Sequence, residues 1–363
     1  MTRVYVAAHL GTRIWGGAER ATTLLLAGLQ ARGHRVLLLC NAPLVAERAE
    51  ALGVPSRVRA IGGDVALPHA LRFAAALRRD PPDALVVATW KKVLWASLGA
   101  KLAGVPRVIA RVGLEGDGPR RAKYRIALSR WVDAVVVNSE RIRPPFAALP
   151  GWEDRVTVIH NGVHPPVRHL PDGAVRAELG IAPDALVVGS VGRLVSMKRF
   201  DRLIDAVAGI GDAVHVVLAG DGPRREELMA RAEELGMRNR LHLLGWRSDA
   251  ADVLAACDAY AVTSDREGMS NAMLEALACG LPVVSTPVSG AHEALAPLED
   301  GDAPGIVTGG FDAAEVGGAL RSILGDPARR AAMAAAARRV AEERFGFGRM
   351  LDRWEAVLGV EGR

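Results

Sequence analysis

The chain has 363 residues, half of them hydrophobic, which is too long for one typical domain and apolar enough to bury two cores. Its three cysteines, Cys40, Cys257 and Cys279, stand far apart, which excludes a disulfide scaffold or a clustered zinc site. Residues 1–165 hold 24 Lys and Arg against 12 Asp and Glu, whereas the remainder holds 22 against 29. The basic first half predicts a polyanionic partner there, such as a phosphate-rich acceptor or an anionic membrane surface.

The start of the chain predicts no targeting segment. Met1 leads directly into a strand pattern, and no apolar run reaches 18 residues. We therefore expect a cytoplasmic protein, with peripheral contact on the inner face of the cell membrane as a further option. Aromatic residues do not interleave with basic ones on a sheet pattern, so nucleic acid is not an expected partner.

The first half of the chain alternates apolar strands with amphipathic helices, which is typical of a parallel α/β sheet. Val4–His9 predicts a strand, and Ala18–Ala31 predicts the following helix. Gly16 and Gly17 lie in the loop between them, where a ligand could approach the backbone closely. They do not form a GxGxxG fingerprint, which disfavours an NAD-dependent enzyme. Further strands are expected at Ala84–Thr89, Arg107–Val112, Ala134–Asn138 and Val156–His160.

A proline-rich segment without periodicity, Val163–Gly173, predicts an interdomain linker. A second α/β series follows it. We therefore expect two doubly wound domains, residues 1–165 and 166–345, and a C-terminal helix in 346–363 that could cross back to the first domain. In the second series, strands are expected within Ala185–Arg193 and His215–Pro223 and at Leu241–Leu244, Ala259–Val262 and Val283–Ser285, and helices at Arg224–Leu235, Asp326–Arg344 and Phe347–Leu358.

The stretch Asp265–Thr286 carries the most informative pattern. Glu267 and Glu275 are separated by seven residues, and Ser270 can cap a helix that begins at Asn271. The free N–H groups and the positive dipole end of such a helix suit a phosphate. The same spacing would also fit an ordinary amphipathic helix with two solvated acids.

Two cations, Arg193 and Lys198, follow the first strand of the second domain. They could converge on a diphosphate, although a solvated basic loop would have the same sequence. Together with the helix start and the two glutamates, they predict a site for a nucleoside diphosphate bearing a sugar. Because the cations neutralise the phosphates and no DxD pair follows a strand, no metal and no cofactor are expected.

The motifs, in chain order, resemble those of the family 4 glycosyltransferases, which have the GT-B fold. The resemblance covers almost the whole chain and implies two Rossmann-like domains facing a deep interdomain cleft, with the acceptor side in 1–165 and the nucleotide-sugar side in 166–345. The motifs are GGAE (Gly16–Glu19), VIHNGV (Val158–Val163), GRLVSMK (Gly192–Lys198), AGDGP (Ala219–Pro223) and an E-x7-E signature (Glu267–Glu275).

The resemblance also implies residue roles. Arg193 and Lys198 would bind the donor diphosphate, and Glu267 would contact the transferred sugar; these three are the expected catalytic residues. Glu275 would bind the ribose, and the base would lie near Arg247. The donor-binding residues implied are Gly16, Gly17, Arg111, Arg193, Lys198, Arg247, Glu267, Gly268, Met269, Ser270, Asn271 and Glu275, without a metal ligand.

Two positions depart from the family pattern. Many members carry a His where this chain has Arg111, which could contact the donor or an anionic acceptor instead, or form an ion pair with Glu115 or Asp117. Members also often have Gly after the lysine, where this chain has Arg199, so the conformation of that loop stays open.

The function expected from the resemblance is a retaining, metal-independent, hexosyl-type transfer from a nucleotide sugar, UDP first and GDP second. The acceptor would be a glycan or a lipid-linked molecule in cell-surface polysaccharide or glycolipid synthesis. A GT-B sugar-nucleotide epimerase and a non-catalytic nucleotide-sugar-binding protein are the alternatives. Basic residues with Trp90, Trp131 and Phe146 among them suggest docking on anionic lipid, unless these aromatic side chains lie in the core.

Overall fold

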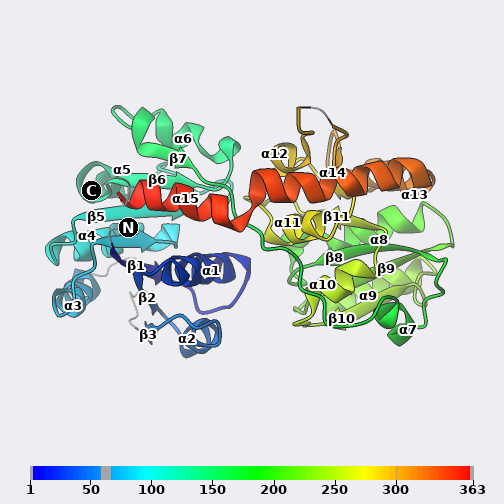
Figure 1. Cartoon of the computed structure of the whole chain (residues 1–363), viewed down its shortest axis with the longest axis horizontal. Helices are drawn as coiled ribbons and strands as arrows, with labels where there is room; N and C mark the ends of the chain where they lie inside the picture. The colour runs from blue at the N-terminus through cyan, green and yellow to red at the C-terminus, as the bar shows by residue number, and fades with distance from the viewer. Residues whose placement is uncertain (1–2, 59–66, 300, 360–363) are drawn as a thin grey trace. The chain divides into compact units, whose positions relative to one another are not determined.

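The computed structural model describes residues 3–58, 67–299 and 301–359, and the chain divides into two compact units (Figure 1). Unit 1 comprises Met1–Asn161 together with Gly348–Arg363, and unit 2 comprises Gly162–Phe347. Each unit contains one parallel sheet with helices packed on it, which confirms the predicted α/β class. None of the described helices is both long enough and apolar enough to cross a bilayer.

The sheet of unit 1 has the strand order β3-β2-β1-β4-β5-β6-β7, and all its described pairings are parallel. The direction of winding reverses between β1 and β4. The carboxyl ends of strands at such a reversal are where open α/β sheets bind ligands. The strands are β1 (Tyr5–Leu10), β2 (Arg35–Cys40), β3 (Ser56–Val58), β4 (Ala84–Val87), β5 (Arg107–Val112), β6 (Ala134–Val137) and β7 (Val156–Val158).

Alternate residues of these strands face opposite sides of the sheet, as the pleat requires. Tyr5 and Ala7 of β1 pack in one core with Phe73 and Val93 from the crossover helices. His9, near the end of β1, is fully buried, and its ring stacks edge-on against Phe73. The helices of unit 1 are α1 (Gly17–Ala31), α2 (Pro43–Glu50), α3 (Leu67–Arg78), α4 (Val93–Leu102), α5 (Ala122–Trp131), α6 (Pro144–Ala147) and α15 (Phe347–Leu358), with short 3-10 turns at Trp90–Lys92, Glu140–Ile142 and Glu153–Arg155.

The last helix, α15, is anchored in unit 1 by a buried acid. The Glu355 carboxylate accepts a hydrogen bond from Arg32 at 2.5 Å and contacts Nε2 of His34 at 2.9 Å. Nδ1 of His34 faces the backbone N–H of Val4, so Nε2 carries the proton that it donates to Glu355. Trp354 of the same helix is buried as well. Residues at the two ends of the chain therefore belong to one folded unit.

The sheet of unit 2 has the strand order β10-β9-β8-β11-β12-β13, again with parallel pairings. Here the winding reverses between β8 and β11, which pair directly. The strands are β8 (Leu186–Val191), β9 (Val214–Ala219), β10 (Leu241–Gly245), β11 (Ala259–Val262), β12 (Val283–Ser285) and β13 (Gly305–Val307).

Unit 2 has an apolar core on each face of its sheet. Val187 packs with residues of α10, α11 and α14, whereas its neighbour Val188 packs with residues of α8, α9 and α13. The helices are α7 (Ala174–Glu178), α8 (Phe200–Ala208), α9 (Arg225–Glu234), α10 (Ala250–Ala255), α11 (Asn271–Ala278), α12 (Ala291–Leu295), α13 (Ala313–Leu324) and α14 (Pro327–Phe345), with a 3-10 turn at Ser196–Lys198.

Candidate functional site

The winding reversal of unit 2 brings together the two loops that carry the predicted catalytic side chains. One loop follows β8 and contains Lys198, and the other follows β11 and contains Glu267. Nζ of Lys198 forms an ion pair with Oε1 of Glu267, and the hydroxyl of Ser264 donates to the same oxygen at 2.7 Å. The cation expected to bind the diphosphate and the anion expected to contact the transferred sugar are therefore direct neighbours, as those two parts of a nucleotide sugar are.

The backbones of these two loops are also bonded to each other. The N–H of Asp265 donates to the carbonyl of Met197 at 2.9 Å, and the Thr263 hydroxyl donates to the carbonyl of Lys198 at 3.1 Å. Arg202, which is buried, donates to the Thr263 carbonyl and to the Asp265 carboxylate. These bonds hold the Lys198–Glu267 pair on a fixed framework, which favours a preorganised charge site.

Arg199 shows how the loop accommodates a side chain where the resembling family often has glycine. Its φ of 49° and ψ of 46° place it in the left-handed region, where it is the one non-glycine residue with a positive φ in the described chain. Its guanidinium contacts Asp201 at 3.0 Å and Asp265 at 3.3 Å. The loop therefore keeps the conformation that glycine favours, and the two acids hold the arginine in it.

Glycines of the AGDGP motif support the loop that carries Arg193. A Cβ at Gly220 would lie 1.9 Å from the carbonyl oxygen of Gly192, and one at Gly222 would lie 2.5 Å from that of Leu194. This close approach allows backbone hydrogen bonds between the two segments. Arg193 itself is exposed, and no described carboxylate forms an ion pair with it. Its charge is thus available to an anion.

The helix α11 begins at Asn271, as the sequence predicts, and Ser270 is its N-cap. The Ser270 hydroxyl accepts from the N–H of Met273 at 3.4 Å. The N–H groups of the first turn of a helix have no partner within the helix, so they can bind an anion. A small pocket beside this helix start is lined by Ser190, Val191, Lys198, Phe200, Tyr260, Val262, Thr263, Ser264, Glu267 and Ser270.

Tyr260 of β11 is a site residue that the sequence reasoning missed. Its hydroxyl contacts both the N–H and the carbonyl of Val191 at the end of β8. Burial raises the pKa of this phenol, and the negative charges of Glu275 and Glu267 raise it further. The phenol stays protonated, and both glutamates lie close enough to act on it. A lone tyrosine in an apolar strand was the available signal, since a buried hydroxyl requires a partner.

Arg247, expected near the base, is already engaged. Its guanidinium pairs with Glu178 at 2.7 Å and with Asp249 at 2.7 Å. The adjacent Trp246 is 63% exposed. A base near Arg247 would therefore meet a guanidinium that already pairs with two carboxylates.

The predicted residues of unit 1 lie around the start of α1. Gly16 is the N-cap of this helix, and Gly17 is its first residue. Arg111, from β5, donates to the hydroxyl of Thr22 at 2.9 Å and to the side chain of Asn161 at 2.9 Å. Burial lowers the pKa of Arg111 to about 10, while the charge of Glu19 acts in the opposite direction. These two hydrogen bonds stand in place of the ion pair with Glu115 or Asp117 that the sequence left open.

The described residues 3–58, 67–299 and 301–359 contain no group of three or more His, Cys, Asp or Glu side chains that could hold a metal ion. All three cysteines are free thiols, and burial raises the pKa of Cys257 to about 12 and that of Cys279 to about 11. Neither thiol is a reactive nucleophile at neutral pH.

Two family models match the chain. The model described as "Glycosyltransferase Family 4" matches residues 15–165, and the model described as "Glycosyl transferases group 1" matches residues 172–340. The lipopolysaccharide core biosynthesis glycosyltransferase LpsE of Rhizobium meliloti (strain 1021) is 32% identical over 276 residues, which are 75% of this chain and 76% of that protein. A D-inositol 3-phosphate glycosyltransferase of Kineococcus radiotolerans is 32% identical over 69% of this chain and 62% of that protein.

Solved structures resemble the chain over its whole length. Anabaena Alr3699/HepE in complex with UDP-glucose has a TM-score of 0.84 at 23% identity, covering 99% of this chain and all of that one. WaaG, described as a glycosyltransferase involved in lipopolysaccharide biosynthesis, has a TM-score of 0.72 at 19% identity, covering 99% of this chain and all of that one. At these identities, the likeness establishes the fold.

Proposed function

This chain belongs to glycosyltransferase family 4, and from that membership we propose that it transfers a sugar from a nucleoside diphosphate donor to a lipid-linked or glycan acceptor. The two parallel sheets and the structural likeness confirm the predicted GT-B fold. The proposed donor is a UDP-hexose, with a GDP-sugar as second choice, and transfer retains the anomeric configuration. The UDP-glucose bound in the Anabaena HepE structure supports a uridine donor.

The observation that carries the proposal is the Lys198–Glu267 pair at the winding reversal of unit 2, beside the start of α11. A nucleotide sugar has a part that complements each of the two charges. Its diphosphate can take the Lys198 ammonium together with Arg193 and the helix N–H groups, and its sugar hydroxyls can donate to the Glu267 carboxylate. Glu275, one turn further along α11, would bind the ribose.

In the proposed reaction, the bond between the anomeric carbon and the donor phosphate oxygen breaks while a bond to the acceptor oxygen forms on the same face. The acceptor proton passes to the leaving phosphate oxygen. Negative charge therefore grows on the diphosphate in the transition state, and Arg193, Lys198 and the α11 amides stabilise it. This charge stabilisation requires no metal ion. Arg111 and the Gly16–Gly17 turn of unit 1 are proposed as further donor contacts.

The acceptor is proposed to belong to cell-surface polysaccharide or glycolipid synthesis, in the cytoplasm and in peripheral contact with the membrane. The name of LpsE, which is a lipopolysaccharide core enzyme, supports this assignment. The excess of Lys and Arg in residues 1–165 supports an anionic acceptor or surface.

A thermal-shift panel of UDP-, GDP- and ADP-sugars, with and without EDTA, tests the donor site in the wild type and in Glu275→Ala. We expect one nucleotide class to raise the melting temperature, with EDTA having no effect and with a smaller shift in the variant. If no nucleotide sugar shifts the melting temperature at millimolar concentration, the donor assignment is wrong.

The reaction itself is separated from its alternatives by NMR of the donor without and with an acceptor lipid. Epimerisation of the sugar without acceptor would indicate the epimerase. Tight binding without turnover on any acceptor would indicate a binding protein. Formation of a glycoside with the anomeric configuration of the donor is the expected result.

A further inference from the structure

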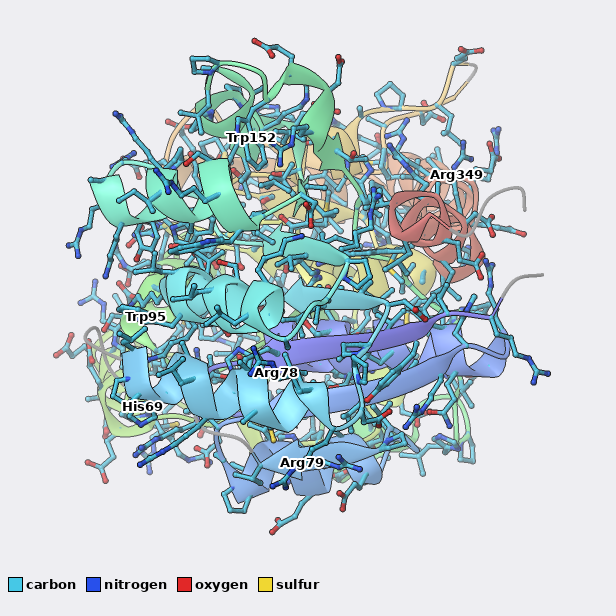
Figure 2. All side chains as sticks on the ribbon, turned by 90° about the vertical axis from the view of Figure 1, so that its left-hand side faces the viewer. His69, Arg78, Arg79, Trp95, Trp152 and Arg349 are labelled. Carbon is cyan, nitrogen blue, oxygen red and sulfur yellow. The ribbon has the colours of Figure 1, made fainter. Side chains whose placement is uncertain are left out.

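Three consecutive helices of unit 1, α3, α4 and α5, lie side by side over one face of its sheet (Figure 2). Their 32 residues include six Lys and Arg and no Asp or Glu. The surface helix α9 of unit 2, by contrast, has four glutamates in ten residues. Surface helices usually mix both signs of charge, so a three-helix layer of one sign is a distinct feature.

The acidic residues that flank this layer do not neutralise most of it. Asp80, after α3, pairs with Arg35, and Asp133, after α5, pairs with Lys101. Lys101 is therefore compensated. Four of the other cations have no ion pair with any carboxylate in the described part of the chain: Arg72, Arg78, Arg125 and Arg130. Arg78 and Arg125 donate to backbone carbonyls, which leaves their charge uncompensated.

The same layer exposes apolar side chains at helical spacing. α3 buries Ala70, Phe73 and Leu77 against the core, yet its outer side carries Leu67 and Leu71, which are 49% and 53% exposed. The two leucines are four residues apart, so they lie together on one side of the helix. Ile126 of α5 is 46% exposed, and Leu102 at the end of α4 is 38% exposed. A single exposed leucine is ordinary, but an exposed pair on a helix whose inner side is also apolar is not.

The aromatic residues expected to dock on lipid do not belong to this exposed set. Trp90 is 5% exposed and Phe146 is fully buried, and the two rings pack edge to face in the core. Trp131 is partly buried against the same core. Of the two alternatives that the sequence left open for these aromatic side chains, the structure shows the core, and the exposed aliphatic residues of α3 and α5 were not predicted.

We propose that the surface formed by α3, α4 and α5 docks on an anionic lipid bilayer. Anionic headgroups complement the uncompensated arginines, and Leu67, Leu71 and Ile126 can enter the boundary between headgroups and acyl chains. A single-stranded nucleic acid would instead favour exposed aromatic rings for stacking, whereas the large apolar side chains that this surface exposes are aliphatic. Binding to the bilayer does not depend on the proposed function. Only its biological role rests on that function, because the membrane would hold the lipid-linked acceptor.

Vesicle co-sedimentation of the full chain tests the proposal, without donor or acceptor. Vesicles of phosphatidylcholine with about one third phosphatidylglycerol are compared with pure phosphatidylcholine. We expect binding to the anionic vesicles alone, falling at least tenfold between low salt and half-molar salt because ions screen exposed charges.

Two matched pairs of variants locate the contact. Arg72→Glu combined with Arg130→Glu should weaken vesicle binding at least tenfold. The control, Arg329→Glu combined with Arg353→Glu, makes the same change of net charge at exposed positions outside this surface. Its vesicle binding should fall only by the small amount that the change of net charge causes. Leu71→Gln should weaken binding several-fold, whereas Leu44→Gln, at a leucine of α2 that is 44% exposed, should not.

Equal loss in a test pair and its control, or equal binding to neutral vesicles, would overturn the proposal. A self-association that the α3–α5 variants abolish in the absence of vesicles would assign the surface to a second copy instead. The donor thermal shift is measured without lipid, so a failure here leaves the proposed function standing, and the reverse also holds.

Discussion

Lys198 and Glu267 are paired with each other across the loops that follow β8 and β11. The ammonium and the carboxylate each neutralise the charge of the other. The ammonium of Lys198 has further N–H donors and the carboxylate of Glu267 has a second oxygen, so each can bind a part of the donor while the pair stays intact. This relationship yields predictions that differ for the diphosphate and for the sugar.

Glu267→Gln should separate nucleotide binding from transfer. Without the carboxylate, Lys198 loses its partner and becomes more available to phosphate, so the affinity for UDP should stay the same or increase by a few-fold. Transfer should fall by about 100-fold or more, because the contact with the sugar is weakened. Calorimetry with UDP and a transfer assay measure the two effects, with the exposed Glu226→Gln of α9 as control. Weaker UDP binding would contradict the prediction.

Arg193→Ala should lower kcat by about 100- to 1,000-fold with little loss of stability. The side chain is exposed and has no described ion-pair partner, so its removal leaves no buried charge behind. Arg329→Ala, an exposed arginine of α14, is the control. Unchanged transfer by Arg193→Ala would remove this residue from the proposed mechanism.

Arg199 tests the left-handed conformation of the loop. Both Arg199→Gly and Arg199→Ala remove the contacts with Asp201 and Asp265, but only glycine adopts a φ of 49° without strain. The glycine variant should therefore be more stable than the alanine variant by about 1 kcal/mol in urea unfolding. At an ordinary helical or extended position the order would be reversed, so an alanine variant of equal or greater stability would refute the left-handed geometry.

His9 should make the fold sensitive to acid. Burial lowers the pKa of its imidazole to about 4, with a smaller contribution from Lys92, against 6.5 in the unfolded chain. Between these pH values the unfolded state binds a proton that the folded state excludes. The free energy of unfolding is therefore unaffected by His9 above pH 6.5 and decreases as the pH falls toward 4. At pH 5 the loss relative to pH 7.5 should be about 2 kcal/mol.

The comparison that isolates this effect is His9→Leu, measured by urea unfolding at both pH values. His215 and His242 also have lowered pKa values, mainly through burial, and they contribute to the acid sensitivity of both proteins equally. The wild type should lose more stability than the variant. Parallel curves for the two proteins would show that His9 accepts a proton in the folded state.

The site could be predicted from sequence where its geometry is local. The cap at Ser270 and the start of α11 at Asn271 depend on residues within four positions of each other. Lys198 and Glu267 come together because their loops meet where the winding of the sheet reverses. The alternation of strands and helices in the sequence already indicated such a parallel sheet. Two of the three-residue strands, β3 and β13, were not predicted because they are too short to show periodicity, whereas β7 and β12, equally short, were predicted.

The contacts that sequence could not give are those between distant positions. Arg247 and Glu178 are separated by 69 residues, and nothing local indicates that they pair. Arg111 reaches Thr22 and Asn161 from the interior of β5, so neither spacing nor charge pattern identifies its partners. The same holds for the inward orientation of Trp90, because an amphipathic pattern with an aromatic residue fits both a core and a membrane contact.

The return of α15 to unit 1 has a consequence for biosynthesis. Unit 2 is one uninterrupted segment, but unit 1 lacks the helix bearing Trp354 and Glu355 until all of unit 2 has been translated. A nascent chain can thus fold unit 2 before Glu355 is available to pair with Arg32 and His34 of unit 1. A chain that stops before Trp354 would join a complete unit 2 to a unit 1 without this helix, and the apolar surface that α15 covers would be exposed to solvent and prone to aggregation.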